Sequence, residues 1–233
     1  IPFCRVGSAY SDASNQDMLT HTVGSLVEQY GLQGERLGDV ALGAVMKHAS
    51  DWNLSREVVL GSGLSPHTPG ITLQRACGTS LDAAIIIANK VAAGQIDAGV
   101  AGGSDTASDI PIAFQRRFAR RLLAASRAKS FMDRLRAFRG FRPRELKPAY
   151  PAVSEPRTGL SMGEHTEKMA KEWDITREAQ DQFAYDSHRK AARAYEDGFF
   201  EDLVVPFRDV ERDNILRPDT TPEKLADLKP AFD

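Results

Sequence analysis

Cys77 is the residue whose type and position best suit it to chemistry. It follows a short apolar segment, residues 71–73, and precedes an apolar helical segment, with Gly78 directly after it. Backbone N–H groups and the dipole at a helix start favour negative charge, so this turn would stabilise a thiolate and the oxyanion of an attacked carbonyl. A cysteine here could equally pack as a small buried hydrophobe. The position alone leaves both interpretations open.

The composition is that of an ordinary soluble globular protein, since 42% of the 233 residues are hydrophobic and 27% are charged. A net charge of −2 gives the whole chain no electrostatic reason to bind nucleic acid. The two cysteines, Cys4 and Cys77, are too few for a disulfide scaffold, which predicts a reducing compartment such as the cytoplasm. The opening residues lack a secretory signal, so we do not expect secretion. The histidines show no zinc-ligand spacing, and no metal is expected.

The first hundred residues alternate helix and strand signals. Helices are expected at residues 14–30, 54–60 and 81–92, and strands at residues 39–45, 71–73 and 98–101. Repeated βαβ units of this size predict an α/β fold with a largely parallel sheet covered by helices. The helix after Cys77 is apolar on nearly every side, so we expect it to be buried in the middle of the fold.

The character of the sequence changes at about Ser104. Between positions 116 and 147 there are twelve basic residues and only two acidic ones, Asp133 and Glu145. No strand is expected there. Further helices are predicted at residues 160–173 and 176–197, and a strand at residues 204–207. The remaining tail reads as loop around one short helix.

The basic stretch has three possible uses. It could steer polyanionic coenzyme A, or dock a partner subunit or an anionic membrane surface. It could also be a solvated set of helix faces, which is the default interpretation of such charge runs.

Four segments in fixed order resemble the thiolase family. The segment Gln-Arg-Ala-Cys-Gly-Thr-Ser-Leu-Asp-Ala-Ala around Cys77 is similar to the nucleophile segment of thiolases. Residues 98–105, Ala-Gly-Val-Ala-Gly-Gly-Ser-Asp, look like the strand and glycine pair that follow it. Residues 159–181 resemble the coenzyme A-binding loop domain, and Leu-Lys-Pro-Ala-Phe-Asp at residues 228–233 resembles its end. The basic stretch and residues 213–218 look most like the fatty-acid β-oxidation thiolases of trifunctional-enzyme type.

The resemblance implies a thiolase-like N-terminal βαβαβ layer with an inserted, mainly helical loop domain. Residues 1–104 would be the N-terminal core without its first strand, so the sheet would be incomplete. Residues 105–233 would be the loop domain, which binds coenzyme A and takes part in oligomerisation. The C-terminal thiolase domain would be absent from these residues. A sheet lacking strands exposes unpaired edges, which predicts pairing with another chain.

The resemblance also implies roles for individual residues. Cys77 would be the acyl-accepting nucleophile. Met162 would lie beside the acyl and pantetheine pocket, although an ordinary packing methionine has the same spacing. Arg217 would contact the nucleotide end of coenzyme A, where a guanidinium suits a phosphate, and Lys224 would lie near the same nucleotide. His165 is interpreted as structural. No covalently bound cofactor is implied, because coenzyme A and acyl-CoA are the substrates.

Thiolase chemistry, as the resemblance implies, needs a histidine in a Gly-His-Pro motif and a second cysteine beside a Gly-Gly-Gly-type turn. Neither motif occurs in the 233 residues, so the chain alone is expected to be an inactive fragment of an acyltransferase. A homodimer or higher oligomer is expected, with a hydroxyacyl-CoA dehydrogenase/hydratase subunit as a possible partner. A non-catalytic acyl-CoA or coenzyme A-binding subunit is the main alternative. A ketoacyl synthase is disfavoured by residues 162–167 and 228–232.

Overall fold

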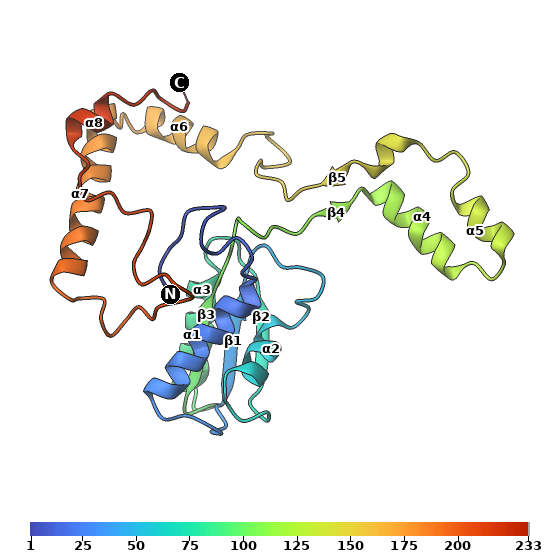
Figure 1. The fold of residues 1–233 in the computed structure, drawn as a ribbon, viewed down its shortest axis with the longest axis horizontal. Helices are drawn as coiled ribbons and strands as arrows, with labels where there is room; N and C mark the ends of the chain where they lie inside the picture. Colours follow the sequence, from blue (N-terminus) through green and yellow to red (C-terminus); the bar gives the residue numbers. More distant parts are fainter. Residues whose placement is uncertain (233) are drawn as a thin grey trace. The chain divides into compact units, whose positions relative to one another are not determined.

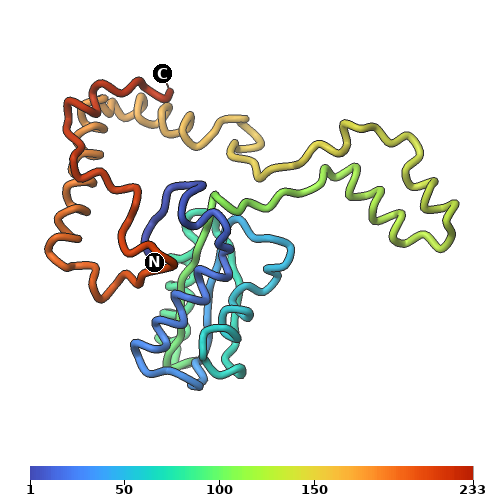
Figure 2. The backbone as a smooth tube through the Cα atoms, in the orientation of Figure 1, coloured from blue at the N-terminus to red at the C-terminus, as the bar shows by residue number. Residues whose placement is uncertain are grey.

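The computed structural model describes residues 1–232, which form two compact units (Figure 2). One unit combines residues 1–109 with the chain from Val153 onward, and the other is Ile110–Ala152. The sequence predicted a single division after residue 104. In the structure, the helical segments from Val153 onward form one compact unit with the residues around Cys77.

A three-stranded parallel sheet is the centre of the first unit. Its strands are β1 (Asp39–Gly43), β2 (Gly70–Leu73) and β3 (Gly99–Gly103), in the order β2-β1-β3. Val40 of β1 lies opposite Gly70 on one side and Val100 on the other. All five residues of β1 are buried, as expected for a central parallel strand. The predicted α/β class and parallel strands are confirmed.

Helices cover both faces of this sheet, as Figure 1 shows. The first face carries α1 (Asn15–Gln29) and α2 (Leu54–Gly61), whose apolar side chains enclose Val40 and Leu42. The second face carries α3 (Thr79–Ala92), which packs on Ala41, the residue between Val40 and Leu42 in the strand. Successive side chains of a strand point to opposite faces, so β1 alternates between the two helix layers. The result is a helix–sheet–helix sandwich.

The termini of α1 follow directly from the sequence. The Ser14 hydroxyl accepts a hydrogen bond from the Asp17 N–H, and the Asp17 carboxylate accepts one from the Ser14 N–H. This reciprocal cap satisfies two N–H groups that the helix itself leaves unpaired. After the helix, Gly31 adopts φ +64°, a left-handed conformation that side chains resist. Both ends of the predicted helix are therefore confirmed to within one residue.

The prediction that α3 is buried on nearly every side is wrong. The helix buries one narrow face on the sheet, formed by Thr79, Ala83 and Ile87. Leu81 is 68% exposed and Ile85 is also exposed, because nothing within residues 1–232 covers their side of the helix. The apolar composition of α3 was read correctly, but composition alone cannot say which faces have a partner.

The first unit also contains α6 (Met162–Glu172), α7 (Arg177–Glu196) and α8 (Pro222–Ala226). These confirm the three helices predicted beyond residue 159. No helix described here is both long enough and apolar enough to cross a bilayer.

The strand predicted at residues 204–207 is wrong. Pro206 has no N–H to give to a strand ladder, and Phe207 forms only an isolated bridge with Val210. Phe207 packs instead as an anchor, with its ring centroid 5.2 Å from that of Tyr10 in an edge-to-face arrangement and Met18 in the same cluster. The apolar run is therefore explained by core packing, not by strand pairing.

The second unit is a helical hairpin closed by a short antiparallel pair, β4 (Ala113–Phe114) and β5 (Pro148–Ala149). Between the two strands lie α4 (Arg116–Arg127), α5 (Phe131–Ala137) and the 3-10 helix η1 (Pro143–Leu146). Four phenylalanines form its aromatic cluster, namely Phe114, Phe118, Phe138 and Phe141. No strand was expected between residues 116 and 147, and the two short strands of this unit lie just outside that range.

Candidate active site

Cys77 lies in the tight turn that joins β2 to α3, and its side chain is exposed. The Thr79 hydroxyl accepts a hydrogen bond from the Arg75 N–H at 2.8 Å and donates one to the Ala76 carbonyl at 2.7 Å. The Gly78 N–H adds a bond to the Arg75 carbonyl at 3.0 Å. These bonds fix the backbone on both sides of the thiol. The alternative of a buried, packing cysteine does not apply in this structure.

The turn stores backbone strain immediately before the thiol. Ala76 has φ +43°, in the left-handed region where a side chain costs about 1–2 kcal/mol. Such strain persists only where surrounding contacts over-determine the backbone, as the Thr79 hydroxyl does at Ala76. A sharp strand-to-helix turn of this kind presents its central side chain outward. This is the arrangement that an attacking nucleophile requires.

The start of α3 has no side-chain cap. Gly78 occupies the cap position and carries no side chain to accept from the first-turn N–H groups. The nearest cation in sequence, Arg75, is paired with Asp82 at 2.9 Å. The uncapped N–H groups and the helix dipole therefore supply the positive potential at this turn. They can stabilise the charge that develops on an oxyanion beside the thiol.

Glycines at the strand ends let α3 begin directly against the sheet. A Cβ atom added at Gly43, the last residue of β1, would lie 2.3 Å from the Thr79 methyl carbon. One added at Gly103, the last residue of β3, would lie 2.7 Å from the Ser80 Oγ atom. Both separations are far inside van der Waals contact. The close approach of the helix that carries Cys77 thus explains Gly103, the second glycine of the pair that ends β3.

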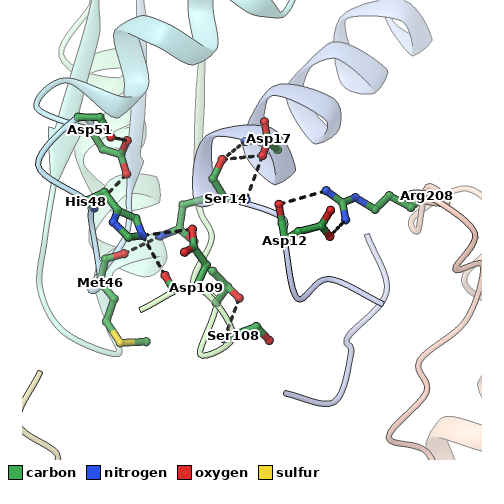
Figure 3. A network of polar contacts seen from close by, with 12 residues as sticks. Asp12, Ser14, Asp17, Met46, His48, Asp51, Ser108, Asp109 and Arg208 are labelled. Carbon is green, nitrogen blue, oxygen red and sulfur yellow. Dashed lines mark hydrogen bonds and ion pairs between the residues drawn. The ribbon is translucent and has the colours of Figure 1, made fainter. Parts of the chain in front are cut away.

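A polar network missed by the sequence analysis joins the loops at the ends of β1 and β3 (Figure 3). The Asp105 carboxylate accepts hydrogen bonds from the Val45 and Met46 N–H groups at 2.8 Å. His48 Nε2 lies 3.1 Å from the Asp109 carboxylate. The signal in the sequence was polar residues directly after two neighbouring parallel strands, where such sheets place their sites.

Lys47 connects this network with the strand that leads to the thiol. Its ammonium group donates to the Gln74 side-chain oxygen at 3.2 Å and to the Ala44 carbonyl. Gln74 stands three residues before Cys77, so the loop after β1 braces the approach to the turn. No described side chain of this network hydrogen-bonds to Cys77 itself.

A cavity of the first unit lies elsewhere, on the side of the sheet that carries α1. It measures about 450 Å³ and is lined by the N-terminal segment, α1 and β3. Cys4 borders it and Cys77 does not. The thiol therefore stands on an open surface of the described chain and not in this cavity.

Met162 opens helix α6 and is 71% exposed. Ser161 and Glu164 form a reciprocal cap around it, which fixes the start of the helix. Gly163 lies against the ring of Phe232, because a Cβ added there would be 2.0 Å from the ring Cζ atom. The two sequence segments around Met162 and Phe232 are therefore in direct contact, and Met162 is not a buried packing residue.

Lys224 is paired with Asp219, just before α8, and the charge of Arg217 acts on the same carboxyl group. Lys224 Nζ donates to the Asp219 carboxylate at 3.0 Å and to its carbonyl at 2.7 Å. The Lys224 hydrogen bond and charge, with a smaller contribution from Arg217, hold the pKa of Asp219 below its ordinary value. The Arg217 N–H donates to His188 Nδ1 at 3.3 Å. No contact joins Arg217, Lys224 or Met162 to Cys77 in residues 1–232.

The family model "Thiolase, N-terminal domain" matches residues 1–233. The chain belongs to the thiolase family. It is 38% identical over 238 residues to a 3-ketoacyl-CoA thiolase of Klebsiella pneumoniae (strain 342), covering all of this chain and 55% of that protein. The same values hold for a 3-ketoacyl-CoA thiolase of Yersinia pestis (strain Pestoides F). The chain therefore spans about half the length of these curated thiolases.

A solved thiolase-fold structure agrees with the architecture. The crystal structure of the Bacillus anthracis acetyl-CoA acetyltransferase matches all of this chain and 57% of its own, with a TM-score of 0.78 and 26% sequence identity. The thiolase resemblance, the fold class and the acyltransferase family expected from the sequence are confirmed. The alternative of a non-catalytic binding subunit is not favoured by these relatives.

Several histidines of this thiolase chain are engaged away from the thiol. His21 bonds the Pro206 carbonyl, His48 pairs with Asp109, and His165 Nε2 lies 3.1 Å from the Thr158 hydroxyl. In the part of the chain that is described, no histidine hydrogen-bonds to Cys77, and no group of three or more His, Cys, Asp or Glu side chains could hold a metal ion. A base for the thiol is therefore not identified among these residues.

Proposed function

We propose that Cys77 is the acyl-accepting nucleophile of a thiolase that cleaves 3-ketoacyl-CoA. The observation that carries the proposal is an exposed cysteine on a strained turn at an uncapped helix start. The Cys77 thiolate attacks the C3 carbonyl, and the C2–C3 bond breaks to leave acetyl-CoA as its enolate, which then takes up a proton. The thiol of a second coenzyme A accepts the acyl group from Cys77 and regenerates the thiol.

The whole enzyme needs a base for the Cys77 thiol and an acid for the enolate. The thiolase resemblance assigns these tasks to a histidine and a second cysteine in motifs that the 233 residues do not contain. Within this chain, the backbone N–H groups of the β2–α3 turn would stabilise the oxyanion. We propose that the described residues supply the nucleophile and the electrostatics, and that proton transfer is supplied by the rest of the enzyme.

We propose coenzyme A contacts for Met162, Arg217 and Lys224, within a loop domain formed by residues 105–233. The exposed thioether of Met162 suits the apolar acyl and pantetheine portion. Arg217 is exposed and its guanidinium suits the nucleotide phosphates. Lys224 is the weaker candidate because its ammonium group is already bound to Asp219. A phosphate would have to compete with that carboxylate.

We further propose that the enzyme works in the degradative direction, in fatty-acid β-oxidation. It is supported by the two relatives named 3-ketoacyl-CoA thiolase, which are more similar in sequence than the acetyl-CoA acetyltransferase. We also propose a homo-oligomer in the cytoplasm, with a hydroxyacyl-CoA dehydrogenase/hydratase subunit as partner. The exposed apolar side of α3 supports association, since Leu81 and Ile85 are open to solvent in the described chain.

The test is acyl transfer to Cys77 in the native gene product. Incubation with acetoacetyl-CoA should add one acetyl group to the intact mass, and peptide mapping should place it on Cys77. A Cys77→Ala variant should lose the adduct and the turnover, whereas Cys4→Ser should retain both. Iodoacetamide labelling of Cys77 should be slowed by acyl-CoA. Binding of acyl-CoA without any acyl adduct on Cys77 would instead indicate a non-catalytic binding subunit.

A further inference from the structure

Arg177, the first residue of α7, holds the segment of the chain that carries Arg217 and Lys224. We propose that Arg177 is a positioning residue for coenzyme A, which places these two cations against the nucleotide without contacting the nucleotide itself. This role rests on the proposed coenzyme A contacts of Met162, Arg217 and Lys224. Its effect should appear in the binding of the nucleotide and not in the binding of the pantetheine arm.

The guanidinium of Arg177 joins two helices. Its Nε atom donates to both carboxylate oxygens of Asp181, one turn further along α7, at 2.9 Å. Its Nη2 atom donates to the carbonyls of Leu225 at 2.6 Å and Leu228 at 2.9 Å, where α8 ends. The last carbonyls of a helix have no partner within it, and a cation suits the negative end of the helix dipole. Arg177 therefore caps the end of α8 with a charged donor that Asp181 keeps in orientation.

His188 supplies a second hydrogen bond between α7 and the same segment. Its Nδ1 atom accepts from the Arg217 N–H at 3.3 Å. His188 lies about three turns after Arg177 in α7, which is about 16 Å along the helix axis. The segment 217–228 therefore lies along α7 and is bonded to it near both of its ends. The bond at His188 is long and has a neutral donor, whereas those of Arg177 are shorter and charge-assisted, so Arg177 is the stronger attachment.

Other contacts connect α7 and α8 with α6, the helix beside them in Figure 1. Phe232, shortly after α8, lies against Gly163 in the first turn of α6, where an added Cβ would be 2.0 Å from the ring Cζ atom. At the other end of α6, the Ile175 N–H donates to the Ala170 carbonyl at 2.8 Å, just before α7 begins. The three helices thus form a closed ring of contacts. Arg177 closes this ring, because it supplies hydrogen bonds between α7 and the end of α8.

The ring fixes the spacing between the proposed coenzyme A contacts. Met162 is the exposed first residue of α6, and Lys224 lies in α8, so the two belong to different sides of the ring. Helix α8 has only five residues, which is too short to be stable without tertiary contacts. Groups that are held in place before the ligand arrives bind it more tightly, since the ligand does not have to order them. Without Arg177, the nucleotide itself would have to order α8.

The existing bonds of Arg177 separate this role from a direct phosphate contact. The N–H groups of Nε and Nη2 are already used by Asp181, Leu225 and Leu228, and the side chain is half-buried. A lysine at this position would keep the positive charge. It could not reproduce the fork of donors, because an ammonium group is a compact charge on a flexible stem. Arg177→Lys therefore distinguishes the effect of charge from the effect of position.

The experiment is calorimetric titration of the native gene product with coenzyme A and with pantetheine, which lacks the nucleotide. The measured quantity is the Kd for pantetheine divided by the Kd for coenzyme A. Arg177→Gln should lower this ratio about tenfold, the effect of one lost charge-assisted hydrogen bond, through weaker binding of coenzyme A alone. Arg177→Lys should lower it by a similar factor, and Asp181→Asn by less. A purely structural role would instead weaken the binding of both ligands by the same factor.

Arg193→Gln is the matched control. Arg193 pairs with Asp197 at 3.2 Å in the same i,i+4 arrangement at the other end of α7, and its side chain is 81% exposed. This variant should keep the parent ratio, and circular dichroism should show the parent helix content in all variants. If Arg177→Gln does not fold, Asp181→Asn provides the test. The positioning role is overturned if Arg177→Gln, or Asp181→Asn in its place, keeps the parent ratio or weakens both ligands equally. It is also overturned if Arg193→Gln has the same effect.

The double variant Arg217→Gln, Lys224→Gln distinguishes this role from the proposed function. It removes the proposed nucleotide contacts directly and should lower the same ratio. If the double variant lowers the ratio and Arg177→Gln does not, only the positioning role is wrong. If the parent binds coenzyme A no more tightly than pantetheine, or the double variant keeps the parent ratio, the proposed nucleotide contacts are wrong and the positioning role is wrong with them.

Discussion

Gly43 and Thr79 stand so close that a single added carbon between them would clash. A Cβ at Gly43 would lie 2.3 Å from the Thr79 methyl carbon and equally close to the Leu73 carbonyl oxygen. Thr79 is buried and bonded on both sides of the Cys77 turn. The end of the central strand therefore sets the position of the thiol through one side chain.

The first prediction is that Gly43→Ala destabilises the fold and displaces the Cys77 turn. Overpacking of a tight site costs about 1–3 kcal/mol, which should lower the midpoint of urea unfolding. The rate of iodoacetamide labelling at Cys77 should change as well. Gly102→Ala is the matched control, since its nearest neighbour, the Leu42 Cδ2 atom, lies at an ordinary 3.6 Å. Equal effects of the two substitutions would contradict the proposed role of the Gly43–Thr79 approach.

The second prediction concerns the Thr79 hydroxyl. Thr79→Val keeps the shape of the side chain but leaves the Arg75 N–H and the Ala76 carbonyl without this partner. The loss of these bonds should reduce the free energy of unfolding by about 1–3 kcal/mol. Ser80→Ala should have a much smaller effect, because Ser80 is exposed. Urea unfolding of the three proteins provides the measurement, and a stable Thr79→Val protein would show that the turn holds without the hydroxyl.

The third prediction concerns the strain at Ala76. Ala76→Gly should increase the free energy of unfolding by up to about 1 kcal/mol, since glycine adopts φ +43° without the steric cost of Cβ. Ala83→Gly, in the middle of α3, should instead decrease it by about 1 kcal/mol. The decisive outcome is that the two substitutions change the free energy of unfolding in opposite directions. A destabilising Ala76→Gly would mean that Ala76 makes contacts worth more than its strain.

Much of the fold could be predicted because local signals and long-range packing agree. The cap at Ser14 and the stop at Gly31 bound α1 by themselves, and the apolar run of β1 suits a strand covered on both faces. The failures have one cause. For α3 and for the segment around Phe207, the prediction was based on apolar composition alone. Burial and pairing depend on which other segments of the chain pack against a segment, and composition does not specify them.

The candidate site divides in the same way. Cys77 could be found because a strand–glycine–helix pattern is local in sequence. The Asp105 and His48 contacts were missed, because they join loops about 60 residues apart and only the position of both loops after parallel strands pointed to them. The roles of Met162, Arg217 and Lys224 depend on how coenzyme A binds, which their contacts within the chain do not determine. For them the structure gives exposure and neighbours, and their roles remain predictions.

The fourth prediction is a loss of structure in the helical unit Ile110–Ala152 under acid. The Arg121 guanidinium, through its hydrogen bond and charge, holds the pKa of Glu145 below its ordinary value. A depressed folded-state pKa means that the pair contributes stability above the ordinary value of 4.5, and that this contribution is lost as pH falls through the lower folded-state value. The protection of the α4 and α5 amides against exchange, corrected for the intrinsic pH dependence of the exchange rate, should therefore decrease below about pH 4.5.

Glu145→Gln is the control for that pH dependence. Its hairpin should exchange faster than the parent at neutral pH, since Arg121 loses its carboxylate, and should show less further change on acidification. Asp133→Asn, which removes an exposed ion pair of the same unit, should leave the acid transition in place. If Asp133→Asn abolishes the transition and Glu145→Gln does not, Glu145 is not the group that titrates.

The fifth prediction is that the 233-residue chain does not turn over 3-ketoacyl-CoA by itself. Cys77 is exposed and poised, but no described histidine contacts it, and removing the base of a cysteine–histidine pair lowers rates by orders of magnitude. Assays with acetoacetyl-CoA and with a longer 3-ketoacyl-CoA should show no turnover above a Cys77→Ala sample. The same chain should still react with iodoacetamide at Cys77, because alkylation needs only an accessible thiol. Turnover that disappears in Cys77→Ala would show that these residues contain a base for the thiol. His48 and the carboxylates of Asp105 and Asp109, in the loops after β1 and β3, would then be the first candidates to test.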